Sequence, residues 1–288
     1  MGTGDCMKIS ICNELFQGWP IERIFDYAAQ LGYDGVELAP FTLAESVTDI
    51  SMAERKRISK AAESAGTEIV GLHWLLVKPE GLSINHPDGE IRKRTQDYLK
   101  ELIHFCGDLG AKVLVHGSPK QRTVQEGWNP SEAWKRARQT WEICAKTSER
   151  QGVFYCLEPL SPADTNFINT VDEALRMVQE IGHSNLKIAF DCRSASASER
   201  APLPQVLSRV LGSGNLGHVH LNDPNGRGPG FGELELAPVL KTLIDGGYRG
   251  YVSVEVFDFE PDPQTIASRS IGYLHGICEA LGHSPRRA

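Results

Sequence analysis

VFYCLEPLSPADTNFINTVDEALRMVQEIGHSNLKIAFD, residues 153–191, is the stretch from which the fold can be deduced. It begins with an apolar, β-rich run, Val153–Glu158, and ends with a second such run, Leu186–Asp191. Between the two runs, Thr170-Val-Asp-Glu173 forms a capping box, a pattern that begins a helix. Apolar residues then follow at helical spacing as far as Gly182, a typical helix end. The stretch therefore predicts a strand, a crossover helix and a second strand.

The same alternation extends along the whole chain. Eight β-rich runs are separated by segments of helical periodicity, and these runs are Lys8–Cys12, Gly35–Leu38, Ile69–Leu75, Lys112–His116, Val153–Glu158, Leu186–Asp191, Leu216–Leu221 and Tyr251–Val256. Such alternation is typical of parallel strands joined by helices, and eight units take roughly 250 residues. An open doubly wound sheet is disfavoured because the first strand–helix turn lacks a Gly-rich phosphate fingerprint. We predict an α/β fold, a single-domain (β/α)8 TIM barrel over residues 7–282, with disordered termini at 1–6 and 283–288.

The composition is that of an ordinary globular protein. The 288 residues are 41% hydrophobic and 23% charged, and the formal net charge is −7. An acidic chain is a poor candidate for binding nucleic acid, and no apolar run approaches the roughly 18 residues that span a membrane. The seven cysteines are odd in number and form no C-x-x-C pair, so a disulfide framework is not expected. We expect a soluble cytoplasmic protein with neither a nucleic-acid nor a membrane partner.

Several of the predicted strands contain or end on an ionisable side chain. In a TIM barrel the carboxyl ends of the strands converge on one mouth, where catalysis takes place. The groups are Glu37, His73, His116, Glu158, Asp191, His220 and Glu255. Three carboxylates and one imidazole from the last four strands suit a single divalent ion: Mn, Mg, Co or Fe, with Zn also possible. A structural ion pair explains one such glutamate equally well, but four groups at corresponding positions favour a metal site.

Five motifs resemble those of a known family. They are LGYDGVEL at 31–38, LEPL at 157–160, FD at 190–191, HVHLNDPNGRGPGFGELEL at 218–236 and YVSVEVF at 251–257. From Lys8 to about Leu281 the chain resembles the sugar-phosphate isomerase/epimerase-like branch of the xylose isomerase-like TIM barrels. That group includes ketose 3-epimerases, inosose dehydratases and relatives of endonuclease IV.

The resemblance implies a metal site and a catalytic pair. It implies that Glu158, Asp191, His220 and Glu255 bind one divalent ion, with manganese among the candidates. It further implies that Glu158 and Glu255 exchange a substrate proton from opposite faces. A metal that bridges a carbonyl and a neighbouring hydroxyl acidifies the C–H bond between them and stabilises the enediolate. We therefore expect an isomerase or epimerase of a keto-sugar or related polyol, with a small-molecule sugar substrate and a homo-oligomeric state, dimer or tetramer.

Two departures from the family pattern leave the substrate open. Ser194 stands where relatives often carry a histidine, and Ser161–Phe167 replaces the usual substrate-contacting arginine region. A metal-dependent lyase or dehydratase acting on a keto-sugar, a keto-glycoside or an inositol derivative is therefore an alternative. An endonuclease IV-type nuclease and a sugar-binding barrel without turnover are less favoured.

Further residues are candidates for contacts around the metal. Glu37, His73 and His116 are candidate substrate-binding groups. The alternative for Glu37 and His73 is a buried hydrogen-bonded pair across adjacent strands, and the alternative for His116 is a hydrogen bond to the loop that follows it. Arg227, in the Gly-rich loop, is a candidate for binding an anionic substrate group, and Asp223 is expected to hold His220 or to close that loop. We expect His220 to face the barrel interior and His218 to pack against an outer helix.

Overall fold

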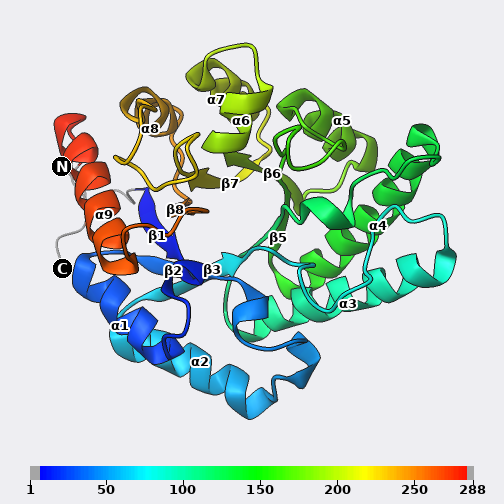
Figure 1. Cartoon of the computed structure of the whole chain (residues 1–288), viewed down its shortest axis with the longest axis horizontal. Coiled ribbons are helices and arrows are strands. Elements are labelled where there is room, and N and C mark those ends of the chain that lie inside the picture. The colour runs from blue at the N-terminus through cyan, green and yellow to red at the C-terminus, as the bar shows by residue number, and fades with distance from the viewer. Residues whose placement is uncertain (1–6, 284–288) are drawn as a thin grey trace.

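Eight parallel strands close into one barrel in the computed structural model, which describes residues 7–283 (Figure 1). Each strand pairs with the next in sequence, and β1 pairs with β8. The strands are β1 (Lys8–Cys12), β2 (Gly35–Leu38), β3 (Glu68–Leu72), β4 (Val113–His116), β5 (Phe154–Leu157), β6 (Leu186–Asp191), β7 (Leu216–Leu221) and β8 (Tyr251–Val254). The predicted (β/α)8 barrel is confirmed. The disorder predicted for the termini concerns residues that, apart from His283, lie outside the described range.

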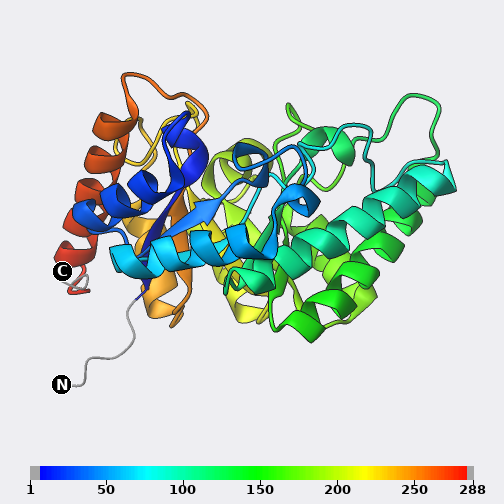
Figure 2. The same ribbon diagram turned by 90° about the horizontal axis from the view of Figure 1, so that it is seen from below.

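Helices surround the barrel, as the two ribbon views show (Figures 1 and 2). They are α1 (Ile21–Leu31), α2 (Met52–Ala65), α3 (Gly89–Asp108), α4 (Pro130–Gln151), α5 (Val171–Ile181), α6 (Cys192–Ser198), α7 (Leu203–Gly212), α8 (Ala237–Asp245) and α9 (Pro263–Ala280). Short 3-10 turns follow β1, β2 and β4: η1 (Asn13–Phe16), η2 (Pro40–Thr42), η3 (Val47–Asp49) and η4 (Pro119–Gln121).

Helix α5 forms as its sequence predicts. The Thr170 hydroxyl accepts a hydrogen bond from the Glu173 amide at 3.3 Å, and the Glu173 carboxylate accepts one from the Thr170 amide at 3.0 Å. Both halves of the capping box are therefore present, and they satisfy amides that a helix start leaves without partners. Gly182 ends the helix at φ 68°, a left-handed conformation that glycine adopts without steric cost.

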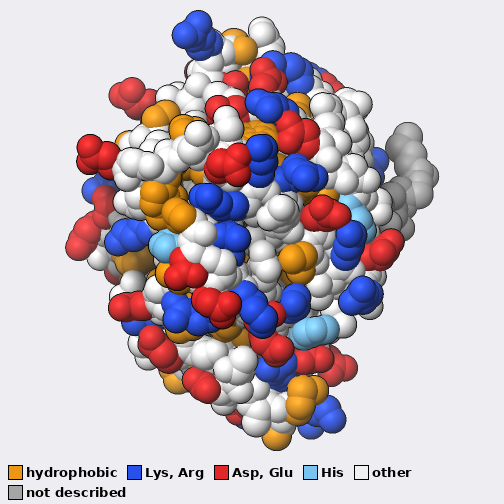
Figure 3. Space-filling view, turned by 90° about the vertical axis from the view of Figure 1, so that its right-hand side faces the viewer, with side chains coloured by type: hydrophobic (Ala, Val, Ile, Leu, Met, Phe, Trp, Pro, Cys, Tyr) orange, Lys and Arg blue, Asp and Glu red, His pale blue; other side chains and the backbone are white. Residues whose placement is uncertain are grey.

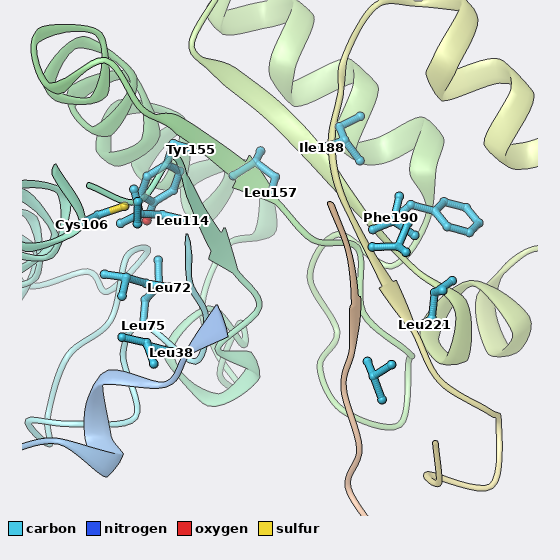
Figure 4. Close-up of a cluster of buried hydrophobic side chains, with 14 of the residues drawn as sticks. Leu38, Leu72, Leu75, Cys106, Leu114, Tyr155, Leu157, Ile188, Phe190 and Leu221 are labelled. Carbon is cyan, nitrogen blue, oxygen red and sulfur yellow. The ribbon is translucent and has the colours of Figure 1, made fainter. Parts of the chain in front are cut away.

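Two apolar layers hold the barrel together. The larger layer lies between the strands and the helices, where side chains such as Leu72, Leu114 and Tyr155 gather on one side and Ile188 and Phe190 on the other (Figure 4). A separate small cluster is formed by the inward-facing side chains of β4, β5 and β6: Val113, Val115, Cys156 and Ala189. Successive side chains of a strand point to opposite faces, so each strand contributes to both layers.

Polar side chains occupy the interior nearer the carboxyl ends of the strands. Glu37 on β2 hydrogen-bonds His218 on β7, although these strands do not pair with one another. Ser10 on β1 and Ser253 on β8 share a further buried hydrogen bond of 2.7 Å. Because β2 and β7 are not neighbours, a contact between Glu37 and His218 can form only across the barrel, so both side chains point inward.

The outer surface carries both signs of charge. Over the face formed by α3 and α4, lysines and arginines are interspersed with aspartates and glutamates (Figure 3). Within residues 7–283, no helix combines the length and apolar character needed to cross a bilayer.

Gly71 on β3 provides a test of the packing inside the barrel. A Cβ atom at this position would overlap the Val113 carbonyl of β4, which is backbone and cannot rotate away. Gly71→Ala should therefore lower the free energy of unfolding by about 1–3 kcal/mol, measured by urea denaturation. Gly276→Ala on α9 is the matched control, because nothing lies within 4 Å of the added carbon. A helical alanine there should leave stability unchanged or slightly higher, and equal effects of the two substitutions would contradict this account.

Candidate metal centre and active site

Four buried side chains from the last four strands meet at the mouth of the barrel. Glu158 follows β5, Asp191 ends β6, His220 lies on β7 and Glu255 follows β8. One ligand atom from each lies within 4.8 Å of those of the other three. Nδ1 of His220 is 3.0 Å from Oε1 of Glu158 and 3.1 Å from Oε2 of Glu255. The structure thus brings together the four residues named from the sequence.

The Asp191 carboxylate is held by neighbouring donors. Nδ2 of Asn222 donates to Oδ2 at 2.6 Å, and the Ser194 amide donates to Oδ1 at 2.6 Å. The second bond makes Asp191 the N-cap of α6. Asn222 is itself fixed, because its Oδ1 accepts from the Arg193 amide at 2.8 Å. Asp191 is therefore oriented before any ligand arrives.

A glycine leaves room for the Glu158 carboxylate. Gly117 follows β4, and a Cβ atom built there would overlap Oε2 of Glu158. Any larger residue at this position would displace the carboxylate from the other three groups.

The electrostatics of the cluster reflect three acids around one base. Burial by itself would lower the pKa of His220, but Glu255 and Glu37 outweigh it and hold that pKa well above 6.5. Burial raises the pKa of Glu255 to about 7, with His220 opposing the shift and Glu158 adding to it. Burial, and then Glu158, raises the pKa of Asp191. The site therefore favours extra positive charge, which without a metal is carried by the imidazolium.

Glu37 anchors the histidines beneath the cluster. Its Oε2 is 2.8 Å from Nε2 of His218 and accepts from the Ser253 hydroxyl at 2.5 Å, while Oε1 is 3.2 Å from Nε2 of His220. Burial opposes ionisation of Glu37, yet His218 and His220 keep its pKa well below 4.5. A carboxylate on Nε2 of His220 directs Nδ1 toward Glu158 and Glu255, an arrangement common around metal-binding histidines.

The expectation for His218 was wrong. It lies inside the barrel against Glu37, not against an outer helix. His218 and His220 are two residues apart on β7 and therefore share one face of the strand.

His73 lies beside the cluster and is backed by a second acid. Its Nε2 is 2.7 Å from Oε2 of Glu14, and its Nδ1 is 3.6 Å from Oε1 of Glu37. Burial would lower the pKa of His73, but Glu14 and then Glu37 raise it to about 9. His73 and Glu37 are thus linked by charge, but the hydrogen bond expected between them is not present: His73 makes its hydrogen bond to Glu14 instead.

A cavity of about 80 Å³ opens above the cluster. Glu158, Asp191 and Glu255 line it from below, and its walls include His73, Trp74, Ser118, Arg193, Ser194 and Phe257. Arg193 pairs with Asp164 at 2.9 Å, and its guanidinium lies 4.7 Å from the centre of the Phe257 ring. The cavity therefore has an acidic base and a rim that combines aromatic rings with one ion pair.

His116 is not at this cavity. It lies on the outer face of β4, where Nδ1 is 2.5 Å from the Tyr155 hydroxyl and Nε1 of Trp141 donates to it at 3.3 Å. Burial, and then Arg122, lowers the pKa of His116 to about 3. Trp141 belongs to α4, outside the barrel, so the sequence-based assignment of His116 to substrate binding is withdrawn.

The two candidates in the loop after β7 also lie elsewhere. Arg227 pairs with Asp258 at 2.8 Å and is not among the cavity residues. Asp223 accepts hydrogen bonds from the amides of Asn225 and Leu234, so it closes its own loop instead of holding His220. Closure of the loop was one of the two roles expected for Asp223.

Several residues of the site were not singled out from the sequence. Asn222 orients Asp191, Glu14 supports His73, and Ser253 supports Glu37. The two-residue alternation of β7 and β8 could have predicted that Asn222 and Ser253 point inward. Asn222 lies two residues after His220, and Ser253 lies two residues before Glu255. Nothing in the sequence links Glu14 with His73, since the contact joins residues 59 apart.

The cluster fits a divalent cation. Its donors are carboxylate oxygens and one imidazole nitrogen, all buried and mutually close. A cation at Nδ1 of His220 would take the place of the proton there, and it would offset the repulsion among three carboxylates. Carboxylate-rich sets with one imidazole suit Mn, Co, Fe, Mg or Zn.

The fold and this cluster agree with the outcome of comparison with known proteins. The chain matches the xylose isomerase-like TIM barrel family over residues 25–276 and belongs to that family. The resemblance read from the sequence motifs is thereby confirmed.

Relatives in this family include sugar epimerases. A D-psicose 3-epimerase from Ruminiclostridium cellulolyticum is 29% identical over 253 residues, which cover 83% of this chain and 81% of the relative. A fructoselysine 3-epimerase from Shigella flexneri is 24% identical, covering 83% and 86% of the two chains. The crystal structure of a 3-keto-D-glucoside 4-epimerase from E. coli superposes with a TM-score of 0.80 at 22% identity, over 94% and 99% of the chains. The two curated relatives are thus sugar epimerases by name, and the superposition shows that the E. coli protein shares the fold.

The raised pKa of His73 predicts how stability depends on pH. A histidine whose folded pKa, about 9, exceeds its unfolded value contributes stability fully below about 6.5 and loses it as pH rises through 9. Metal-free wild type should therefore exceed His73→Gln in free energy of unfolding by roughly 3 kcal/mol more at pH 6 than at pH 9.5. Urea denaturation at both pH values, in the presence of a chelator, measures this difference.

His275→Gln on α9 is the control for that experiment. Burial lowers the pKa of His275, so its contribution should change with pH in the opposite direction. Parallel pH dependences for the two variants would show that the Glu14–His73 pair does not hold the charge assigned to it.

Proposed function

We propose that the protein is a divalent-metal-dependent epimerase or isomerase of a keto-sugar. The observation that carries the proposal is the buried cluster of three carboxylates and one histidine at the mouth of the barrel. The curated relatives named as D-psicose and fructoselysine 3-epimerases support the substrate class, because both names denote ketose chemistry.

In the proposed mechanism, the four residues of the cluster bind the metal ion and neighbouring residues orient them. A divalent ion held by the four groups would polarise the carbonyl and neighbouring hydroxyl of a keto-sugar. Asn222 and the Ser194 amide keep Asp191 in place as a ligand, and Glu37 keeps His220 in place. These contacts fix the geometry before the substrate enters, so little reorganisation is needed on binding.

Glu158 and Glu255 are the proposed acid–base pair. They come from β5 and β8, which are not neighbours in the barrel, and both carboxylates line the cavity. One takes the proton from the carbon beside the carbonyl, and the other returns a proton to the opposite face. Removal and return of a proton at one carbon invert its configuration without changing the composition of the sugar.

The metal assignment is tested by elemental analysis of purified protein incubated with Mn and then desalted. Wild type should retain about one divalent ion per chain, and Asp191→Ala should lose it, because a ligand and its hydrogen-bonded support are removed together. Asp164→Ala is the matched control, since Asp164 lines the same cavity but lies outside the cluster. Equal metal content in wild type and Asp191→Ala would contradict the assignment.

The catalytic assignment is tested by proton exchange in heavy water. With D-fructose or D-psicose, wild type should give an epimer that carries deuterium at the inverted carbon, detected by NMR. Glu158→Gln and Glu255→Gln should each lower the rate at least about 100-fold, since an amide cannot act as a general base. Full metal occupancy with full turnover in both variants would overturn the assignment. A product that has lost the elements of water would indicate a dehydratase.

A further inference from the structure

A second, apolar cleft opens beside the cavity above the carboxylate cluster. Its volume is about 270 Å³, against about 80 Å³ for the cavity itself. We call it the aromatic cleft, and its apolar lining consists of Phe41, Trp74, Val77, Val256, Phe257 and Phe259. A ketose, which carries a hydroxyl on nearly every carbon, offers little apolar surface to a lining of this kind.

The aromatic cleft and the cavity share a wall. Trp74 and Phe257 line both, and their rings meet nearly edge-on, with centroids 6.1 Å apart at 71°. A ligand whose polar end reached Glu158 and Glu255 would therefore pass these two rings before its remainder entered the aromatic cleft.

The rings around the aromatic cleft are unusually exposed. Phe41 and Phe257 are 36% and 38% exposed, and they are two of the five large hydrophobic side chains that the described residues leave exposed. Trp74 adopts φ 51°, in the left-handed region that is costly for a bulky residue. Exposed aromatic surface and a strained backbone at one opening are both typical of ligand-binding sites.

One residue of the aromatic cleft, Glu14, has a carboxylate oxygen that accepts no hydrogen bond from the described residues. Glu14 is only 4% exposed, and its Oε2 contacts His73. Its Oε1 is buried and has no hydrogen-bond partner among the described residues. A buried acceptor without a donor is costly, so an occupant that carries a hydroxyl would be favoured over a wholly apolar one.

We propose that the substrate is a keto-sugar bearing a hydroxylated aromatic ring, and that this ring occupies the aromatic cleft. The proposal rests on the proposed function, which places the sugar at the carboxylate cluster. The aromatic ring packs among Phe41, Phe257 and Phe259, and its hydroxyl donates to Oε1 of Glu14. Trp74 covers the junction between ring and sugar.

Binding of stable glycosides tests the proposal without requiring turnover. By isothermal calorimetry on the full chain with Mn, 4-hydroxyphenyl β-D-glucopyranoside should bind about tenfold more tightly than methyl β-D-glucopyranoside. That factor corresponds to about 1.4 kcal/mol, within the range for burying an aromatic ring against others. Phenyl β-D-glucopyranoside should fall between the two, because it lacks the donor for Glu14.

Phe41→Ala should abolish most of the preference for the aromatic glycosides. Phe154→Ala is the matched control: its phenylalanine is 42% exposed, but it begins β5, at the end of the barrel away from the mouth. Equal or undetectable binding of the aromatic and methyl glycosides would overturn the proposal, as would equal effects of the two substitutions. Tighter binding of methyl β-cellobioside than of the phenolic glycoside would also overturn it, in favour of a second sugar ring.

The outcome for the aromatic cleft can be separated from that for the proposed function. Phe41 lines the aromatic cleft but not the cavity, so Phe41→Ala should epimerise an unsubstituted ketose as wild type does. Ketose turnover without aromatic preference refutes only the aromatic-cleft proposal. Aromatic preference that Phe41→Ala removes, without turnover of any keto-sugar, refutes only the epimerase.

Discussion

Three buried carboxylates around a single imidazole impose the constraint on which the rest of this structure depends. Glu158, Asp191 and Glu255 repel one another at the distances observed, and burial removes the water that would screen them. Protonated His220 neutralises part of this negative charge, and the pKa of His220 is raised as a result. Surrounding contacts then serve to keep the acids in place against their own repulsion: donors on Asp191, and a glycine that leaves space beside Glu158.

The barrel meets this constraint through its two-residue periodicity. Inward positions of β4, β5 and β6 form a small apolar cluster, and Glu158 and Asp191 lie two residues beyond Cys156 and Ala189 on the same faces. Glu37, His218 and Ser253 form a hydrogen-bonded group on the other side of the interior. Glu37 contacts both histidines of β7. A change of charge in the cluster therefore also alters the electrostatic environment of Glu37 and His218, deeper in the barrel interior.

Local patterns predicted the fold well, and long-range contacts account for what was missed. The capping box at Thr170 and the glycine at 182 define α5 from neighbouring residues alone, and the eight β-rich runs correspond to the eight strands. The four clustered residues could be named because each lies at a strand end. His116 also ends a strand, but its side chain points to the outer face. It was misplaced because the prediction used its position along the strand and did not consider which face it lies on. The support that Glu14 gives His73 depends on how β1 and β3 are brought together, which no local pattern encodes.

Two positions at which the sequence was expected to depart from the family, Ser194 and the segment 161–167, contribute to the walls of the cavity and not to the four-residue cluster. The Ser194 amide donates to Asp191, and Ser194 lines the cavity with a buried hydroxyl that has no hydrogen-bond partner among the described residues. Every residue type except proline would keep this amide, so substitution at position 194 would alter the cavity wall while the hydrogen bond to Asp191 remained. Trp74 and Phe257 are likewise wall residues: they line both the cavity and the aromatic cleft but are not part of the four-residue cluster. The proposed chemistry thus depends on residues at the strand ends, whereas the proposed choice of substrate depends on residues in the segments that follow them.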